Sequence, residues 1–136
     1  MKNNKLTLLI SFLFALFAST AAYAGTEAKK EINTAITHAS LAEKMSDVKQ
    51  VHMHLHHVIN CLVGPKGVGF DASVGNPCAG MGNGAINDYK AEKVDREMLQ
   101  QALEDANYGL VTNRLKIARN AAQLAVKSLK KSEENL

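Results

Sequence analysis

The sequence predicts an all-α protein: an antiparallel four-helix bundle, or a long helical hairpin that dimerises into one, with a long Gly-rich, disulfide-tethered loop. Apolar residues recur at three- and four-residue spacing in both halves of the chain. A glycine-rich stretch separates these halves. Tryptophan is absent, other aromatic residues are few, and alanine is abundant after Ala91. This composition suits closely packed helices better than a β-sandwich.

The first 24 residues have the pattern of a cleaved secretory signal. Lys2 and Lys5 precede an apolar run over 6–17, and Ala22-Tyr23-Ala24 matches the small-x-small cleavage motif. The apolar run is too short for a membrane span. We therefore expect cleavage after Ala24, which would leave residues 25–136 as a single helical domain in the periplasm or secreted, with no membrane association.

The first predicted helical region runs over 26–63. Its apolar positions are Ile32, Ile36, Leu41, Met45, Val48, Leu55, Ile59 and Leu62. The segment Ser40-Leu41-Ala42-Glu43 fits a capping box, so the region is either two helices joined near Ser40 or one continuous helix. Apolar and histidine residues alternate over 51–56 as in a strand, but no turn signal separates them from the helical pattern. Gly64-Pro65 supplies the helix stop.

Residues 64–88 are predicted to form a long loop. This stretch contains seven of the nine glycines and both prolines. Cys61 ends the preceding helix and Cys78 lies in mid-loop. Two cysteines in an exported protein most simply form one disulfide, which would tether the loop to the helix end. Closing this loop would stabilise the fold by roughly 3 kcal/mol in the chain-entropy model.

A second helical region follows, from Asp88 to about Lys131, with two alanine-rich apolar stripes. Gly109 between the stripes is a candidate C-cap, with Thr112 or Asn113 capping the next helix. Alternatively, Gly109 interrupts one long helix. Joints near both Ser40 and Gly109 would give a compact four-helix bundle. With neither joint, the chain would be a hairpin that needs a homodimer to cover its apolar faces.

Chemistry is concentrated in Val51–Cys61, which holds four of the five histidines. On a helix, His52 and His56 lie about 40° apart on one face, where two neutral imidazoles can bind a copper, zinc or nickel ion. In a continuous helix, His38 falls two heptads before His52, and Met45 lies midway. We therefore predict a transition-metal site made of His52, His56, His38 and Met45 at the edge of the core.

A second ligand face is available on the other side of the same helix. His54, His57 and Cys61 follow one another at three- and four-residue spacing. This face requires Cys61 as a free thiol, which conflicts with the expected disulfide between Cys61 and Cys78. Non-covalent haem b, held by His/Met or bis-His ligands, is the alternative cofactor.

Several functional classes are not expected. Loss of Lys2 and Lys5 leaves 14 basic against 13 acidic residues, a net charge of +1, with no basic face of the kind that nucleic-acid binding requires. The residues between His52 and His56 do not make the HExxH motif, and neither CxxCH nor an inward Glu-x-x-His pair is present. We therefore do not expect the protein to be an enzyme. The first hypothesis is metal buffering, carriage or sensing, the second is haem binding, and the third is a cofactor-free interaction module that uses the loop.

Overall fold

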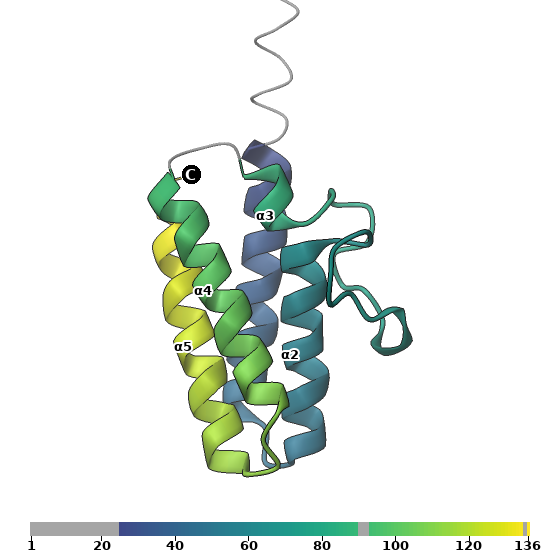
Figure 1. The fold of residues 1–136 in the computed structure, drawn as a ribbon, viewed down its shortest axis with the longest axis vertical. Coiled ribbons are helices and arrows are strands. Elements are labelled where there is room, and N and C mark those ends of the chain that lie inside the picture. Colours follow the sequence, from purple (N-terminus) through teal and green to yellow (C-terminus); the bar gives the residue numbers. More distant parts are fainter. Residues whose placement is uncertain (1–24, 90–92, 135) are drawn as a thin grey trace, which may run out of the picture.

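The computed structural model describes residues 25–89, 93–134 and 136, which contain helices and no strands (Figure 1). The chain is helical over 25–44 and then forms α2 (Val48–Val63), α3 (Ala85–Asp88), α4 (Lys93–Leu110) and α5 (Leu115–Glu133), with a 3₁₀ turn at Ala72–Val74. The all-α prediction is confirmed. The predicted signal over 1–24 lies outside the described residues.

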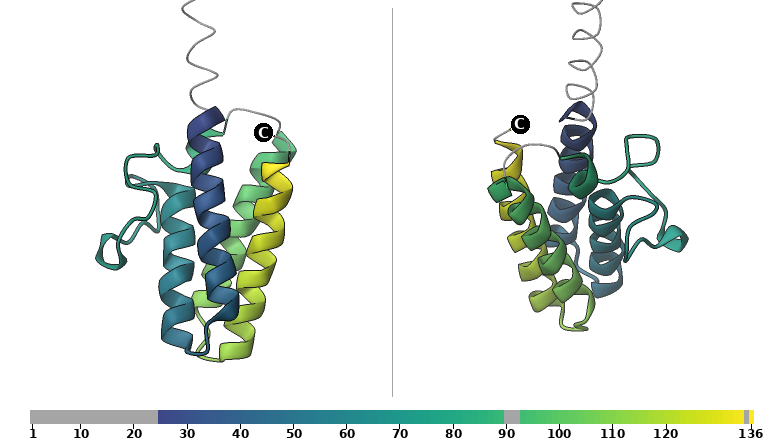
Figure 2. Two further views of the ribbon diagram at one scale, coloured as in Figure 1. Left: turned by 180° about the vertical axis from the view of Figure 1, so that it is seen from behind. Right: turned by 45° about the horizontal axis from the view of Figure 1, so that its top comes forward.

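The long helices lie side by side, and helices that follow one another along the chain run in opposite directions (Figures 1 and 2). α5 packs along α4, and α2 contacts both. The helix over 25–44 lies beside α2 and α5 (Figure 2). The segment between α2 and α3 projects from the outer side of α2, away from α5. None of the described helices is long and apolar enough to cross a membrane.

The first reversal of the chain lies at residues 45–47 and not at Ser40, which is inside the preceding helix. The Met45 N–H donates to the carbonyl oxygens of Leu41 and Ala42 at 3.2 and 3.3 Å and ends that helix. Asp47 has an extended backbone, and its carboxylate accepts a hydrogen bond from the Lys49 N–H at 3.1 Å. Asp47 is therefore the N-cap of α2, because it satisfies an N–H that has no intrahelical partner.

The second reversal lies at residues 111–114, so the predicted C-cap at Gly109 is wrong. Gly109 is buried within α4, where a Cβ atom would lie 2.5 Å from Leu55 Cδ1 and 3.1 Å from Ala121 Cβ. It is a close-approach glycine between three helices. Neither Thr112 nor Asn113 is the N-cap of α5; that position is Arg114, which makes no side-chain capping bond. Neither half of the chain is thus one uninterrupted helix.

The core between the helices is built largely from small side chains. Fully buried alanines line every long helix except α2, which contributes branched apolar residues instead. The fully buried alanines of these helices are Ala28, Ala35, Ala39, Ala42, Ala102, Ala106, Ala118, Ala122 and Ala125. Small side chains let helix backbones approach closely, so a polar side chain at a helix seam can reach its neighbour on the next helix.

The predicted disulfide between Cys61 and Cys78 is confirmed, with a Cα–Cα distance of 5.3 Å. It joins the last turn of α2 to the segment that follows. The predicted loop over 64–88 is not irregular to its end, because Ala85–Asp88 forms α3 and Ala72–Val74 forms a 3₁₀ turn. Asp71 caps that turn, since its carboxylate accepts from the Ser73 N–H at 2.8 Å.

Candidate metal centre

Three histidines from two helices meet at one seam. His54 and His57 are three residues apart on α2, which places them on one face, and His38 reaches them from the helix over 25–44. His38 Nδ1 is 3.1 Å from His54 Nδ1 and 3.2 Å from His57 Nδ1. One nitrogen of each ring lies within 4.8 Å of the others, and all three side chains are half-buried. This group could hold a metal ion.

The orientation of His57 is fixed from outside the group. Its Nε2 lies 2.7 Å from the carbonyl oxygen of Val74. A carbonyl oxygen can only accept, so the ring proton is on Nε2. In neutral His57, Nδ1 therefore carries a lone pair, and this is the nitrogen that faces His38.

Protons alone cannot give both short contacts a full two-centre hydrogen bond when the rings are neutral. His38 Nδ1 takes part in both short contacts, and a hydrogen bond needs one donor and one acceptor. If His38 donates to His57, it has no lone pair left for His54 and can bond to it only by sharing the same proton. If His54 donates to His38, then two lone pairs face each other between His38 and His57. A cation that accepts all three lone pairs removes this conflict.

The surroundings keep the rings of His38 and His54 neutral, as metal ligation requires. Burial, followed by the neighbouring His57 and His54, lowers the pKa of His38 from 6.5 to about 4. Burial and the neighbouring His57 also lower the pKa of His54. Both effects disfavour the imidazolium form, because a buried positive charge loses hydration and repels a like charge.

The spacing suits a small metal ion. In a tetrahedral site with metal–nitrogen bonds of about 2.0–2.1 Å, neighbouring nitrogens lie about 3.3 Å apart. The observed separations of 3.1 and 3.2 Å are close to this value. Three imidazoles would fill three corners of such a tetrahedron. This number of protein ligands is the usual one when zinc keeps its fourth position for water or another molecule.

The other two histidines of the cluster are directed elsewhere. His52 Nε2 lies 2.9 Å from the carbonyl oxygen of Thr112 and so links α2 to the turn between α4 and α5. His56 Nδ1 is buried without a hydrogen-bond partner among the described residues. The structure thus groups His38 with His54 and His57 and not with His52 and His56.

The predicted sulfur ligands also lie in other surroundings. Met45 is in the turn after the first helix and packs against the apolar core. Cys61 is bonded to Cys78, so it offers no thiolate. The face of His54 and His57 is therefore completed by His38 in place of Cys61. The three candidate ligand atoms in this group are therefore all ring nitrogens.

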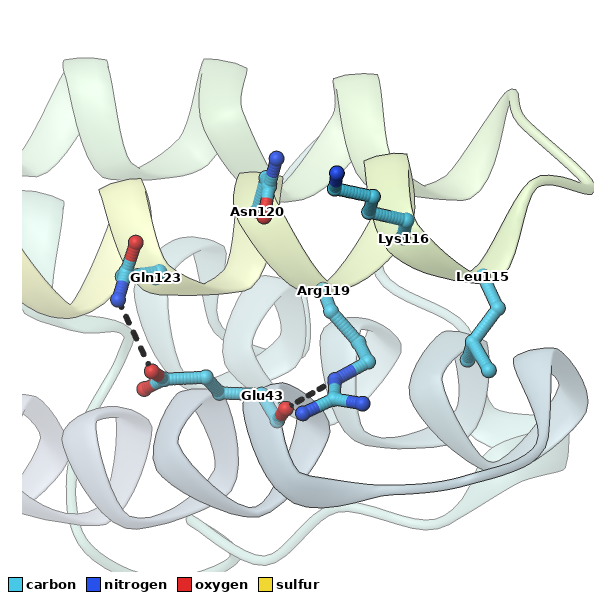
Figure 3. Close-up of a pocket in the computed structure, with 6 residues that line it drawn as sticks. All are labelled: Glu43, Leu115, Lys116, Arg119, Asn120 and Gln123. Carbon is cyan, nitrogen blue, oxygen red and sulfur yellow. Dashed lines mark hydrogen bonds between the residues drawn. The ribbon is translucent and has the colours of Figure 1, made fainter.

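A separate surface hollow of about 370 Å³ lies between the end of the first helix and α5 (Figure 3). Its lining is mostly polar: Glu43, Leu115, Lys116, Arg119, Asn120 and Gln123. Arg119 Nε donates to the Glu43 carbonyl oxygen, and Gln123 Nε2 donates to Glu43 Oε1 at 3.1 Å. These bonds tie the two helices together across the hollow. No histidine lines it.

Comparison with known proteins gives no relative. No family model matches the chain, and neither a curated protein nor a solved structure matches it.

Proposed function

We propose that this protein binds one transition-metal ion through Nδ1 of His38, His54 and His57, and that it buffers, carries or senses that ion. The observation that carries the proposal is the convergence of three ring nitrogens, with His38 Nδ1 3.1 and 3.2 Å from the other two. Imidazole ligands without thiolate favour zinc, copper(II) and nickel over the hard cations. The disulfide and the export signal expected over 1–24 are consistent with an oxidising compartment outside the cytoplasm.

The scaffold that we propose for this site is an antiparallel four-helix bundle with the site at the seam of its first two helices. His38 is on one helix of that pair, and His54 and His57 are on the other. An ion at this seam would be reached from the side of α2 that carries the projecting segment. Metal sites between facing helices are common in bundles of this kind.

Haem b is the weaker candidate. Axial ligands on opposite sides of a haem iron must be about 4 Å apart, at about 2 Å each, with the porphyrin plane between them. His38 Nδ1 is closer than this to both His54 Nδ1 and His57 Nδ1. The third alternative, a cofactor-free interaction module, gives no role to the convergence of three ring nitrogens at one seam.

The test compares two double variants with the wild type. Untagged protein is exported, purified and stripped of metal, and its affinity for zinc, copper(II) and nickel is measured by competition with a chromophoric chelator. In His38→Ala/His57→Ala, one ligand nitrogen is left at the seam, so we expect at least a 100-fold loss of affinity. His52→Ala/His56→Ala removes the same number of histidines outside the group, and we expect its affinity to stay within about threefold of the wild type.

The opposite pattern, in which only the His52/His56 double variant loses binding, would place the ion on the face that the continuous-helix interpretation predicts. A wild-type protein that binds none of the three metals would refute the proposal. A Soret band after addition of haemin would revive the haem alternative. Circular dichroism of each variant shows whether the helical fold is retained.

A further inference from the structure

The segment between α2 and α3 lies beside α2 (Figure 1). It brings one backbone carbonyl to the proposed metal site. This is the Val74 carbonyl, which accepts from His57 Nε2 at 2.7 Å. A free imidazole exchanges between two tautomers, and only one of them has its lone pair on Nδ1. The Val74 carbonyl selects that tautomer. Its placement therefore decides whether His57 presents a ligand to the ion.

Asn60 holds this part of the segment. It lies one turn beyond His57 on α2 and is fully buried. Its Nδ2 donates to the carbonyl oxygens of Asp71 and Gly75 at 2.8 and 2.7 Å. Its Oδ1 accepts from the Asp71 N–H at 2.9 Å. The Asn60 side chain thus makes hydrogen bonds to the backbone on both sides of Val74.

Residues 71–75, to which Asn60 bonds, also form hydrogen bonds with one another and make a closed turn. The Asp71 carboxylate accepts from the N–H of Ser73 at 2.8 Å and from its hydroxyl at 2.6 Å. The Gly75 N–H donates to the Ala72 carbonyl at 3.3 Å. Because these bonds connect residues 71–75 to one another, the turn moves as a unit. Fixing its two ends therefore fixes the direction of the Val74 carbonyl.

The disulfide does not perform the same task. It attaches Cys78, four residues after Val74, to Cys61 on α2. The Cys78 N–H donates to Asn76 Oδ1, and the Cys78 carbonyl accepts from the Met81 N–H, so both bonds lie outside residues 71–75. The disulfide limits how far the segment can move, whereas Asn60 sets the orientation of the turn.

We propose that Asn60 is a positioning residue of the metal site: by holding the 71–75 turn it places the Val74 carbonyl so that His57 binds the ion through Nδ1. This inference rests on the proposed function. The partners that orient a metal-bound histidine typically change affinity by about 10- to 100-fold when they are removed.

The test variant is Asn60→Asp. An aspartate retains the acceptor for the Asp71 N–H, but it replaces the two donors with an oxygen that faces two carbonyl oxygens. We expect zinc affinity to fall by about 10- to 100-fold. In the metal-free protein, the ¹⁵N chemical shifts of the His57 ring should change from one tautomer, protonated at Nε2, to a mixture.

The matched control is Asn76→Asp, the same substitution in the same segment. Asn76 uses only Oδ1, which accepts from the Cys78 N–H at 3.0 Å, and an aspartate retains this bond. The control adds an equal charge without loosening residues 71–75. We expect wild-type zinc affinity and a single His57 tautomer.

A folded Asn60→Asp variant with wild-type affinity and a single tautomer would overturn the inference. If this variant does not fold, Asn60→Ser, which keeps one donor and one acceptor, takes its place with the same expected direction. A wild-type protein that binds no metal refutes the proposed function. If Asn60→Asp still releases the His57 tautomer in that case, Asn60 is a structural clamp only, and its role toward a metal is refuted as well.

Discussion

At the scale of single residues, Glu31 is the most unusual acidic group of the described chain. It is fully buried, and its Oε1 accepts from the Gly84 N–H at 2.9 Å, whereas Oε2 has no hydrogen-bond partner among the described residues. Burial, together with the negative charges of Asp88 and Glu27, raises the pKa of Glu31 from 4.5 to about 7. The bond from Gly84 opposes this shift only in part. Glu31 is therefore largely protonated below neutral pH.

Glu31 should make the stability of the protein depend on pH. The folded state holds a proton that the unfolded state releases above about pH 4.5, so the contribution of Glu31 is complete below 4.5 and is lost as the pH rises to about 7. Glu31→Gln keeps an acceptor for Gly84 and cannot ionise. We expect its free energy of unfolding, relative to the wild type, to rise by roughly 2–3 kcal/mol across this window and then to level off. Urea denaturation at a series of pH values measures the difference, and parallel curves would contradict it.

At the scale of elements, the two ends of the segment between α2 and α3 contact each other, and we call this contact the crossing. Gly64 and Gly84 lie against each other there, and both have positive φ angles, 69° and 101°. A Cβ atom on Gly84 would lie 2.4 Å from the Gly64 nitrogen and from the Val63 carbonyl carbon. These are backbone atoms, so they cannot move aside as the end of a side chain can.

We expect Gly84→Ala to destabilise the protein by about 3 kcal/mol or more, because it adds a backbone clash to the strain of a left-handed residue. Gly80→Ala is the matched control. Gly80 also has a positive φ, 75°, but a Cβ atom there would meet nothing within 4 Å. The control should lose only about 1 kcal/mol, which is the strain alone. Urea denaturation of both oxidised proteins measures this, and equal losses would show that the crossing is not tightly packed.

Much of the element structure could be predicted from the sequence, because apolar periodicity and Gly-Pro signals are local properties. The positions of the reversals could not be predicted as reliably. Ser40-Leu41-Ala42-Glu43 and Asp47-Val48-Lys49-Gln50 both have a capping-box pattern, but only the second begins a helix. The Gly109 signal was misleading for a tertiary reason, since the glycine is needed for close approach to Leu55 and Ala121.

At the scale of the whole molecule, the reversal at 45–47 determines which histidines meet. In one continuous helix His38 lies in line with His52. After the reversal, the two helices run antiparallel and His38 faces His54 and His57 across the seam. Helical periodicity places residues on a face but does not say which faces meet. The roles of Asn60 and of the Val74 carbonyl had no sequence signal, because they depend on how the segment folds back onto α2.

An ion at this seam would join the first helix to α2 and should stabilise the whole fold. His38 is the only one of the three proposed ligands on the first helix, so His38→Ala would remove the link between the helices and keep His54 and His57 on α2. A ligand that binds only the folded state, at 100 times its Kd, stabilises it by about 2.7 kcal/mol. For a domain of this size that corresponds to a rise in Tm of roughly 10 °C.

We expect this rise when zinc is added to the metal-free wild type, and little of it in His38→Ala. His52→Ala serves as the control and should keep the full rise, because His52 bonds to the Thr112 carbonyl outside the group. Differential scanning calorimetry with and without zinc measures the three shifts. An equal rise in wild type and His38→Ala would mean that the ion is held by α2 alone, and the first helix would then have no part in binding it.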